Sequence, residues 1–278
     1  MAVSIPKLLA TKNPISVLLT ISIFSLFLVN KVKSDFSVNF PTFGPNVVKD
    51  IAFENDATLS KGAIQLTKKN EIGNPLPHSV GQSGLFNPIR LYDKSSGQVA
   101  DFTTEFSFVV NKKGRENHGD GFAFIIVTPD FEFPDPKESA GGFLGMFTRE
   151  TAFNSKHQEV VLVEFDTYGD EWDPVPNSQS PHVGIDVSSI KSVVTAPWFN
   201  DITPDGIVVT ARIEYNSGAK KLSVSVTYPG NVPLDSRLTL DIDLTTILPE
   251  KVQIGFSGST GDLVETHDIL SWSFHSTL

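Results

Sequence analysis

Short segments in which apolar and polar residues alternate are the feature that most restricts the fold of this chain. Leu222, Val224 and Val226 alternate with small hydroxyl residues, and Trp272 and Phe274 alternate with serines. Such a period of two places the apolar side chains on one face of a half-buried β-strand. The same pattern recurs in residues 106–110 and 207–215. The chain is therefore expected to form many short strands.

A second kind of strand is predicted at Gly121 to Val127, which is apolar throughout, as in a strand covered on both faces. Turn signals separate the strands, and no segment keeps a long period of 3.6 residues. These turn signals are Asn74-Pro75, Pro134-Asp135-Pro136, Gly141-Gly142 and Tyr228-Pro229-Gly230-Asn231. The pattern predicts an all-β protein, folded as one β-sandwich or jelly roll over residues 35–278.

The first 34 residues have the pattern of a signal peptide. Lys7 and Lys12 precede an apolar run of 15 residues, Ile15 to Val29, and a polar stretch follows up to Ser34. A transmembrane helix needs about 20 apolar residues, so an uncleaved membrane anchor is the less favoured alternative. We expect cleavage near Ser34 and a protein secreted to the extracellular space or the vacuole, without membrane insertion.

Charge and cysteine content narrow the classes of partner. Removing residues 1–34 takes away four lysines and no acids, which leaves 18 basic against 32 acidic residues. Nucleic acids and anionic membranes are bound through Lys/Arg patches, so neither is expected as a partner. Without cysteine, a secreted chain of this length must rely on a large core or on metals.

The segment from Val163 to Pro174 carries most of the chemistry. On a strand, Glu164, Asp166 and Tyr168 share one face, and two neighbouring carboxylates repel unless a cation lies between them. Gly169 and Pro174 are turn-forming residues, which allows the loop between them to fold back over such a cation.

Two metal sites follow from the ligand types in this segment. Asp170 and Asp173 can fold over a cation at Asp166, and these hard oxygen ligands suit calcium. A second cation that shares Asp166 and Asp173 with Glu164 and His182 would have the mixed oxygen and nitrogen set that suits manganese or zinc. The alternative is a solvated acidic loop beside a strand end.

At this point the sequence resembles the legume lectin family over essentially all of residues 35–278. The matching stretches are Phe36-Ser37-Val38-Asn39-Phe40, Asp120-Gly121-Phe122-Ala123-Phe124, Gly141-Gly142-Phe143-Leu144-Gly145, Val163-Glu164-Phe165-Asp166-Thr167-Tyr168, His182-Val183-Gly184-Ile185-Asp186-Val187, Gly255-Phe256-Ser257 and Leu270-Ser271-Trp272-Ser273-Phe274. The resemblance implies a concanavalin A-like jelly roll with a flat back sheet and a curved front sheet. It also implies a secreted lectin that binds glycans or glycoproteins, requires calcium and manganese or another transition metal, and assembles as a homodimer or homotetramer.

The resemblance also implies roles for individual residues. The transition-metal residues would be Glu164, Asp166, Asp173 and His182. The calcium residues would be Asp166, the backbone carbonyl of Tyr168, Asp170 and Asp173. The carbohydrate-binding residues would be Asp120 as hydroxyl acceptor, the Gly142 backbone N–H as donor, Tyr168 as stacking ring, and Asp170, Asp262 and Leu263.

One position departs from the family pattern. The family usually has an asparagine between the aromatic residue and the Trp-Asp-Pro, where its carbonyl binds calcium and its amide donates to a sugar hydroxyl. Here Asp170 or Gly169 aligns with that asparagine, and the loop is one residue shorter. An ionised carboxylate cannot donate a hydrogen bond, so metal binding is expected to persist while binding of simple hexoses weakens.

The sequence gives less support to two other functions. A jelly-roll glycosidase needs a second glutamate four or five residues after Glu164, but Tyr168 and Gly169 stand there and Glu171 falls beyond the turn. We therefore expect no catalysis. The other rival is a lectin-fold storage, defence or partner-binding protein without sugar activity.

Overall fold

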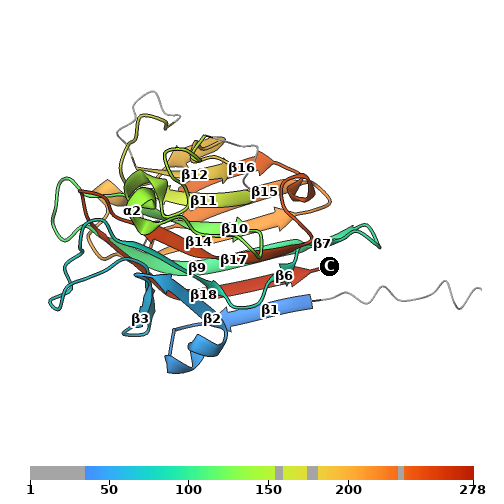
Figure 1. Ribbon diagram of the computed structural model, residues 1–278, viewed down its shortest axis with the longest axis horizontal. Helices are drawn as coiled ribbons and strands as arrows, with labels where there is room; N and C mark the ends of the chain where they lie inside the picture. Colours follow the sequence, from blue (N-terminus) through green and yellow to red (C-terminus); the bar gives the residue numbers. More distant parts are fainter. Residues whose placement is uncertain (1–34, 154–158, 174–180, 231–234) are drawn as a thin grey trace, which may run out of the picture. The chain divides into compact units, whose positions relative to one another are not determined.

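The computed structural model describes residues 35–153, 159–173, 181–230 and 235–278, so the predicted signal peptide lies outside the described residues. Asp35 to Leu278 form a compact unit. The described residues form two large antiparallel sheets, one stacked on the other (Figure 1). The prediction of an all-β sandwich is confirmed.

The back sheet consists, in spatial order, of β16 (Asp235–Asp241), β15 (Lys221–Thr227), β14 (Val209–Asn216), β9 (Asp101–Asn111), β18 (Thr266–Thr277), β4 (Ala63–Gln65) and β3 (Thr58–Ser60), with β1 (Asp35–Phe40) also paired to β18. The front sheet consists of β13 (Val194–Pro197), β12 (His182–Val187), β11 (Val160–Asp166), β10 (Gly121–Val127), β17 (Lys251–Ser259), β5 (Val80–Leu85) and β2 (Ile51–Asn55), with β6 (Ile89–Arg90) paired to β17. A small ribbon joins β7 (Tyr92–Asp93) to β8 (Gln98–Val99). The helical elements are η1 (Pro45–Lys49), α2 (Pro136–Ser139), η2 (Gly141–Phe143), η3 (Asn200–Ile202) and η4 (Leu244–Thr246).

The main hydrophobic core lies between the two sheets. Phe106 and Phe108 of β9 face Phe122 of β10 and Phe165 of β11, and all four side chains are buried. The rings of Phe122 and Phe165 stack with centroids 4.7 Å apart, and Phe108 meets Phe165 edge-on at 5.0 Å. Such aromatic pairs add about 0.5–1.5 kcal/mol each beyond the area they bury. The apolar side chains predicted to lie on one face of these strands therefore form the contact between the two sheets.

A second, smaller core covers the other face of the front sheet. Ala123, Ile125 and Leu162 pack there against Met146 and Phe147, which belong to the loops between β10 and β11. Every residue of β10 is buried as a result, which confirms the prediction of a strand covered on both faces. This second layer holds the loops of the candidate site against the sheet.

Two of the predicted turns are short helical turns instead. At Pro134-Asp135-Pro136, the Asp135 side chain accepts a hydrogen bond from the Lys137 N–H at 2.9 Å and caps α2. Proline at the first helical position is favoured because its missing N–H would have no partner there. Gly141-Gly142 opens the 3₁₀ turn η2. The alternating segment 207–215 starts two residues before its strand, since β14 begins at Val209.

Among the residues that the structure describes, no helix is both long and apolar enough to cross a membrane.

Candidate metal and carbohydrate site

Strand register brings the predicted site residues to one end of the front sheet. Gly121, the first residue of β10, pairs with Asp166 at the end of β11 and with Ser259 at the end of β17. Asp166 in turn pairs with His182, which begins β12. The other predicted site residues lie in the loops next to these strand ends. Segments that are far apart in the sequence therefore meet at this end of the sheet (Figure 1).

Glu164, Asp166 and His182 form a buried cluster. Their potential ligand atoms all lie within 4.8 Å of one another, and His182 Nε2 is 3.0 Å from Glu164 Oε1. Asp166 Oδ1 accepts a hydrogen bond from the Tyr168 N–H at 2.7 Å. Gly184 makes room for this group, since a Cβ there would lie 2.3 Å from Glu164 Oε1. Two carboxylates and an imidazole thus converge in the interior.

Asp170 and Asp173 form the part of the site beyond the strand. The Asp170 N–H donates to Asp173 Oδ2 at 2.6 Å, which closes the loop into a tight turn. Asp173 is not part of the 4.8 Å cluster, but its charge acts on both Asp166 and Asp170 and raises their pKa values. The loop therefore brings the two carboxylates near the cluster.

Burial makes the ionised form of these carboxylates unfavourable in the absence of a cation. Burial and neighbouring carboxylates raise the pKa of Asp170 to about 7 and that of Asp166 well above its ordinary value, and burial raises the pKa of Asp173 to about 6. Asp170 Oδ2 is buried and has no hydrogen-bond partner among the described residues. Oxygen donors with an adjacent imidazole are the set that calcium and a transition metal take together. These residues therefore fit the predicted cations.

Two further residues belong to this cluster and were not predicted. The Ser192 hydroxyl lies between Glu164 Oε1 and Asp186 Oδ1, 2.6 Å from the latter. Burial and the charge of Glu164 raise the pKa of Asp186 well above its ordinary value. The alternation of His182, Gly184 and Asp186 on one face of β12 could have indicated Asp186. Ser192 lies beyond a turn, and no spacing rule places it.

The predicted carbohydrate residues surround the same strand ends. Asp120 is buried, and its Oδ2 accepts a hydrogen bond from the Gly261 N–H. A Cβ on Gly142 would lie 1.8 Å from Asp170 Oδ2, so the Gly142 backbone rests on that carboxylate. The structure thus brings Asp120, Gly142 and Asp170 to one place.

Tyr168, Leu263 and Asp262 form the rim. A Cβ on Gly119 would lie 3.1 Å from Tyr168 Cβ and 3.8 Å from Leu263 Cβ, so these side chains flank the Gly119-Asp120 segment. Tyr168 is 43% exposed, which leaves its ring accessible. Asp262 is almost fully exposed, with Oδ1 3.3 Å from His78 Nε2.

An aromatic wall that was not predicted borders Gly142. Phe143 and Trp172 stack with centroids 5.4 Å apart and an interplanar angle of 11°, and Phe153 meets Trp172 edge-on at 5.9 Å. Phe153 is 55% exposed. This wall places apolar surface directly beside the polar groups of the site.

A buried ion-pair network supports the site from within. His118 Nδ1 lies 2.7 Å from Glu265 Oε2, and its Nε2 lies 3.0 Å from Asp201 Oδ1. Glu265 also contacts His267 at 3.0 Å and accepts a hydrogen bond from Thr167. Burial alone would raise the pKa of Glu265, but hydrogen bonds with His118 and His267 outweigh it and hold the pKa at about 2. Glu265 is therefore ionised inside the protein.

This network ties the site loops together. Thr167 donates its backbone N–H to the Asp120 carbonyl at 2.9 Å, and its hydroxyl oxygen, which donates to Glu265, lies 3.1 Å from the same carbonyl. His118 and Glu265 stand in the chain two residues from Asp120 and Leu263 respectively. Two partners of Glu265, His118 and Thr167, lie 147 and 98 positions away from it in the chain, and sequence spacing gave no sign of them.

Comparisons with known proteins show the family to which the chain belongs. A family model described as "Legume lectin domain" matches residues 35–278. Lectin 11 of Medicago truncatula is 58% identical over 280 residues, which cover 99% of this chain and 94% of that protein. Lectin I-B4 of Griffonia simplicifolia, solved in a metal-free form, superposes with a TM-score of 0.79 at 38% identity and covers 87% of this chain and 100% of its own. The lectin of Bauhinia forficata in complex with GalNAc superposes with a TM-score of 0.77 at 36% identity, over 87% of this chain and 98% of its own. The chain belongs to the legume lectin family.

Proposed function

We propose that this protein is a secreted lectin whose glycan site is organised by two divalent cations. The observation that carries the proposal is the convergence of the Glu164, Asp166 and His182 cluster with Asp120 and Gly142 at one end of the front sheet. The complex of the Bauhinia lectin with GalNAc supports glycan binding by this fold. Secretion, to the extracellular space or the vacuole, rests on the signal-peptide pattern of residues 1–34.

The metal ligands are assigned from the donor types. Glu164, Asp166, Asp173 and His182 would hold manganese or another transition metal, and Asp166, Asp170, Asp173 and the Tyr168 carbonyl would hold calcium. When bound, the cations would supply the positive charge that holds these carboxylates in one arrangement. Asp170 then keeps its place against Gly142 and defines the floor of the sugar site.

The remaining residues have the chemistry that a sugar requires. Asp120 is an acceptor for hydroxyls, the Gly142 N–H is a donor, and the exposed Tyr168 ring offers a stacking surface. Asp262 and Leu263 border the site from the loop after β17. Tyr168 and Gly169 stand four and five residues after Glu164, where a glycosidase needs its second carboxylate, so we propose binding without catalysis.

Restoring the usual loop tests the proposed weakness toward simple hexoses. Inserting one residue after Tyr168 together with Asp170→Asn returns an amide donor and should raise hexose affinity about tenfold or more. Metal content should change little, because an asparagine carbonyl also ligates calcium. Isothermal titration with a hexose panel, beside metal analysis, measures both. If the unmodified protein already binds a hexose as tightly as the repaired loop does, the amide donor is dispensable.

Substitution at Gly142 tests the contact with Asp170. Gly142→Ala places a Cβ 1.8 Å from Asp170 Oδ2 and must displace that carboxylate. Calcium affinity is expected to fall about tenfold or more, as when groups that orient a metal ligand are lost. Gly44→Ala is the matched control, since nothing lies within 4 Å of a Cβ there. Equal calcium affinity in the two variants would contradict the assignment.

One observation favours a second candidate function. Asp170 presents a carboxylate to Gly142 where the family presents an amide, which also fits a lectin-fold storage, defence or partner-binding protein without sugar activity. A glycan array with and without calcium separates the two. Absence of any glycan signal from metal-loaded protein would favour this second function.

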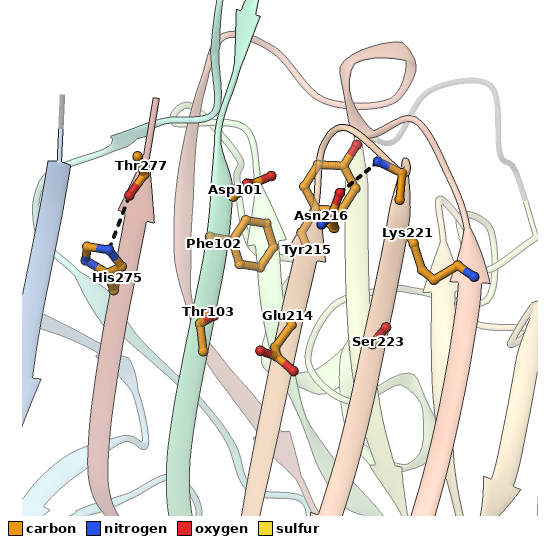
Figure 2. Close-up of a pocket in the computed structure, with 11 residues that line it drawn as sticks. Asp101, Phe102, Thr103, Glu214, Tyr215, Asn216, Lys221, Ser223, His275 and Thr277 are labelled. Carbon is orange, nitrogen blue, oxygen red and sulfur yellow. Dashed lines mark hydrogen bonds between the residues drawn. The ribbon is translucent and has the colours of Figure 1, made fainter. Parts of the chain in front are cut away.

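Assembly as a homodimer or homotetramer through the back sheets is also proposed, on the family resemblance. The outer face of the back sheet is polar. It contains an open pocket of about 420 Å³, whose lining includes Glu214, Lys221 and His275 (Figure 2). Light scattering at micromolar concentration should give at least twice the monomer mass. A monomeric mass would remove the proposed pairing.

A further inference from the structure

A groove lies on the outer face of the front sheet, away from the strand ends that form the proposed sugar site. At those ends, Gly121 of β10 pairs with Ser259 of β17, whereas the groove lies further along the same strands, at Ile125 and Val127. Its volume is about 240 Å³. Pockets that hold drug-sized ligands measure roughly 300–1,000 Å³. The groove therefore has room for one small ring system, and not for an oligosaccharide.

Two glycines form the floor of this groove. Gly84 of β5 pairs directly with Gly255 of β17. Ala52 of β2 and Ile125 of β10 flank this pair in the same row. Directly paired residues share a face of the sheet, so a row of four residues carries only one large side chain. Glycine is needed here because a Cβ on Gly84 would lie 2.5 Å from the Ile254 carbonyl oxygen. The groove is thus a consequence of how closely these strands pack.

Aromatic side chains form the walls of the groove. Phe131 and Phe133 meet edge-on with ring centroids 5.3 Å apart, and both pack against the smaller core. Phe86 lines the groove as well and is 65% exposed. Gln82 forms a polar part of the wall, and its Nε2 donates a hydrogen bond to the Gly145 carbonyl at 3.0 Å. The walls are therefore held in place without a ligand, and one of them presents apolar surface to solvent.

The charge at the groove is negative. Glu54 lines it and is exposed. This residue follows Ala52 by two positions on β2, so both side chains lie on the same face of the sheet. None of the described residues that line the groove is basic. A carboxylate attracts a cation, and the faces of aromatic rings attract one too. The groove therefore complements an apolar ligand that carries a positive charge.

We propose that this groove binds a small aromatic amine in its protonated form. The aromatic ring lies over the floor formed by Gly84 and Gly255, beside Phe86, and the ammonium group faces Glu54. The small volume, the apolar walls and the single carboxylate together define this ligand class. None of the residues proposed to bind metal or sugar lines the groove, so this site is independent of the proposed lectin function.

The test is a titration of the metal-loaded protein with 2-phenylethylamine at pH 7, followed by NMR of the backbone amides. 2-Phenylethanol and 3-phenylpropionate are the neutral and anionic analogues. The amine is expected to bind about fivefold or more tightly than the alcohol, because an ion pair and a cation–π contact are added, and the anion should bind most weakly. The largest amide shifts are expected at Gly84 and Gly255. Equal affinity for amine and anion, or no shift at these glycines with millimolar amine, would overturn the assignment.

Two variants separate the ring contact from the charge contact. Phe86→Ala and Glu54→Gln both change exposed side chains, so the fold should be retained. Each is expected to weaken binding of the amine about threefold or more. Only Phe86→Ala should also weaken binding of the alcohol, since the alcohol has no charge to pair with Glu54.

Matched controls come from elsewhere on the surface. Phe153→Ala removes a ring that is 55% exposed at the aromatic wall beside Gly142. Glu71→Gln removes one exposed carboxylate outside the groove. Neither should change the affinity for the amine. Weaker binding in Phe153→Ala with none in Phe86→Ala would place the amine beside the sugar site. Equal weakening by Glu71→Gln and Glu54→Gln would attribute the preference to net charge, and either result would overturn the proposed site.

Discussion

Removal of divalent cations at pH 7.5 is expected to lower the melting temperature by about 10 °C or more. A ligand present at about 100 times its dissociation constant stabilises the folded state by roughly 2.7 kcal/mol, and two cations contribute twice. In a chain of this size, 1 kcal/mol shifts the melting temperature by about 2–4 °C. The folded state loses stability on cation removal because Glu164, Asp166 and the other buried carboxylates then repel one another. Differential scanning fluorimetry with and without chelator, followed by re-addition of calcium and manganese, measures the shift.

The pH dependence of the metal-free protein gives this prediction a second readout. The pKa values of Asp120 and Asp170 are raised to about 7, and that of Asp173 to about 6, from an ordinary value of 3.8. The folded state therefore binds more protons than the unfolded state between about pH 4 and 7, and stability falls as the pH rises through that window. Metal-free protein should become more stable from pH 8 to pH 5. Metal-loaded protein should lose its cations over the same range, because the ligands must be deprotonated.

The chelator effect should therefore shrink on acidification. Glu164→Gln is the informative variant, since it removes one buried charge and one metal ligand. Its metal content should fall, while its metal-free form should be at least as stable as metal-free wild type. A melting temperature that chelator leaves unchanged at pH 7.5 would show that the carboxylate cluster does not hold structural cations.

Replacement of Glu265 should destabilise the protein by about 3–5 kcal/mol, the range for breaking a buried ion pair. Glu265→Leu leaves His118 buried with Asp201 as its remaining partner and removes the contact to His267. The expected fall in melting temperature is on the order of 10 °C. Because Glu265 also holds Thr167, glycan affinity should fall with stability. Urea unfolding gives the free energy directly.

A surface ion pair is the control for this variant. Glu105→Gln removes one of two carboxylate partners of Arg212 on the exposed face of the back sheet, and Glu214 remains at 2.9 Å. The change should therefore cost about 1 kcal/mol or less. The two variants should also differ with pH. The contribution of Glu265 to the free energy of unfolding is present above the pKa of about 4.5 that Glu265 has in the unfolded state. It is lost as the pH falls toward the folded-state pKa of about 2.

The His118 contribution has the opposite sign. Its pKa is raised above 6.5 by its hydrogen bonds and charge interactions with Glu265 and Asp201, which outweigh burial. Its contribution is present below pH 6.5 and is lost as the pH rises through the folded pKa. The difference in stability between wild type and Glu265→Leu should be greatest between about pH 4.5 and 6.5. A cost no larger than that of Glu105→Gln would refute the structural role of the network.

Local pattern was enough to predict the layers of this protein. Strands β15 and β18 were expected from their alternating apolar residues, and β10 from an unbroken apolar run, because side chains in a strand alternate between faces with a period of two. Glu164 and Asp166 were expected to share a face for the same reason, and His182 to join them. Family resemblance added the order of the loops. These features depend on residues two to about twenty positions apart.

Contacts between residues far apart in the chain could be seen only in the tertiary structure. Ser192 joins the metal cluster across a turn, Glu265 meets His118 from 147 positions away, and Phe143 stacks on Trp172 to form the aromatic wall. The sequence alone showed that a donor was missing near Asp170. The structure showed that Asp170 lies against Gly142 with a carboxylate oxygen unpaired among the described residues. Strand periodicity is a local property, because a short run of alternating residues encodes it. The contacts listed above depend instead on which strands become neighbours. Such contacts join segments far apart in the chain and leave no periodic pattern in the sequence.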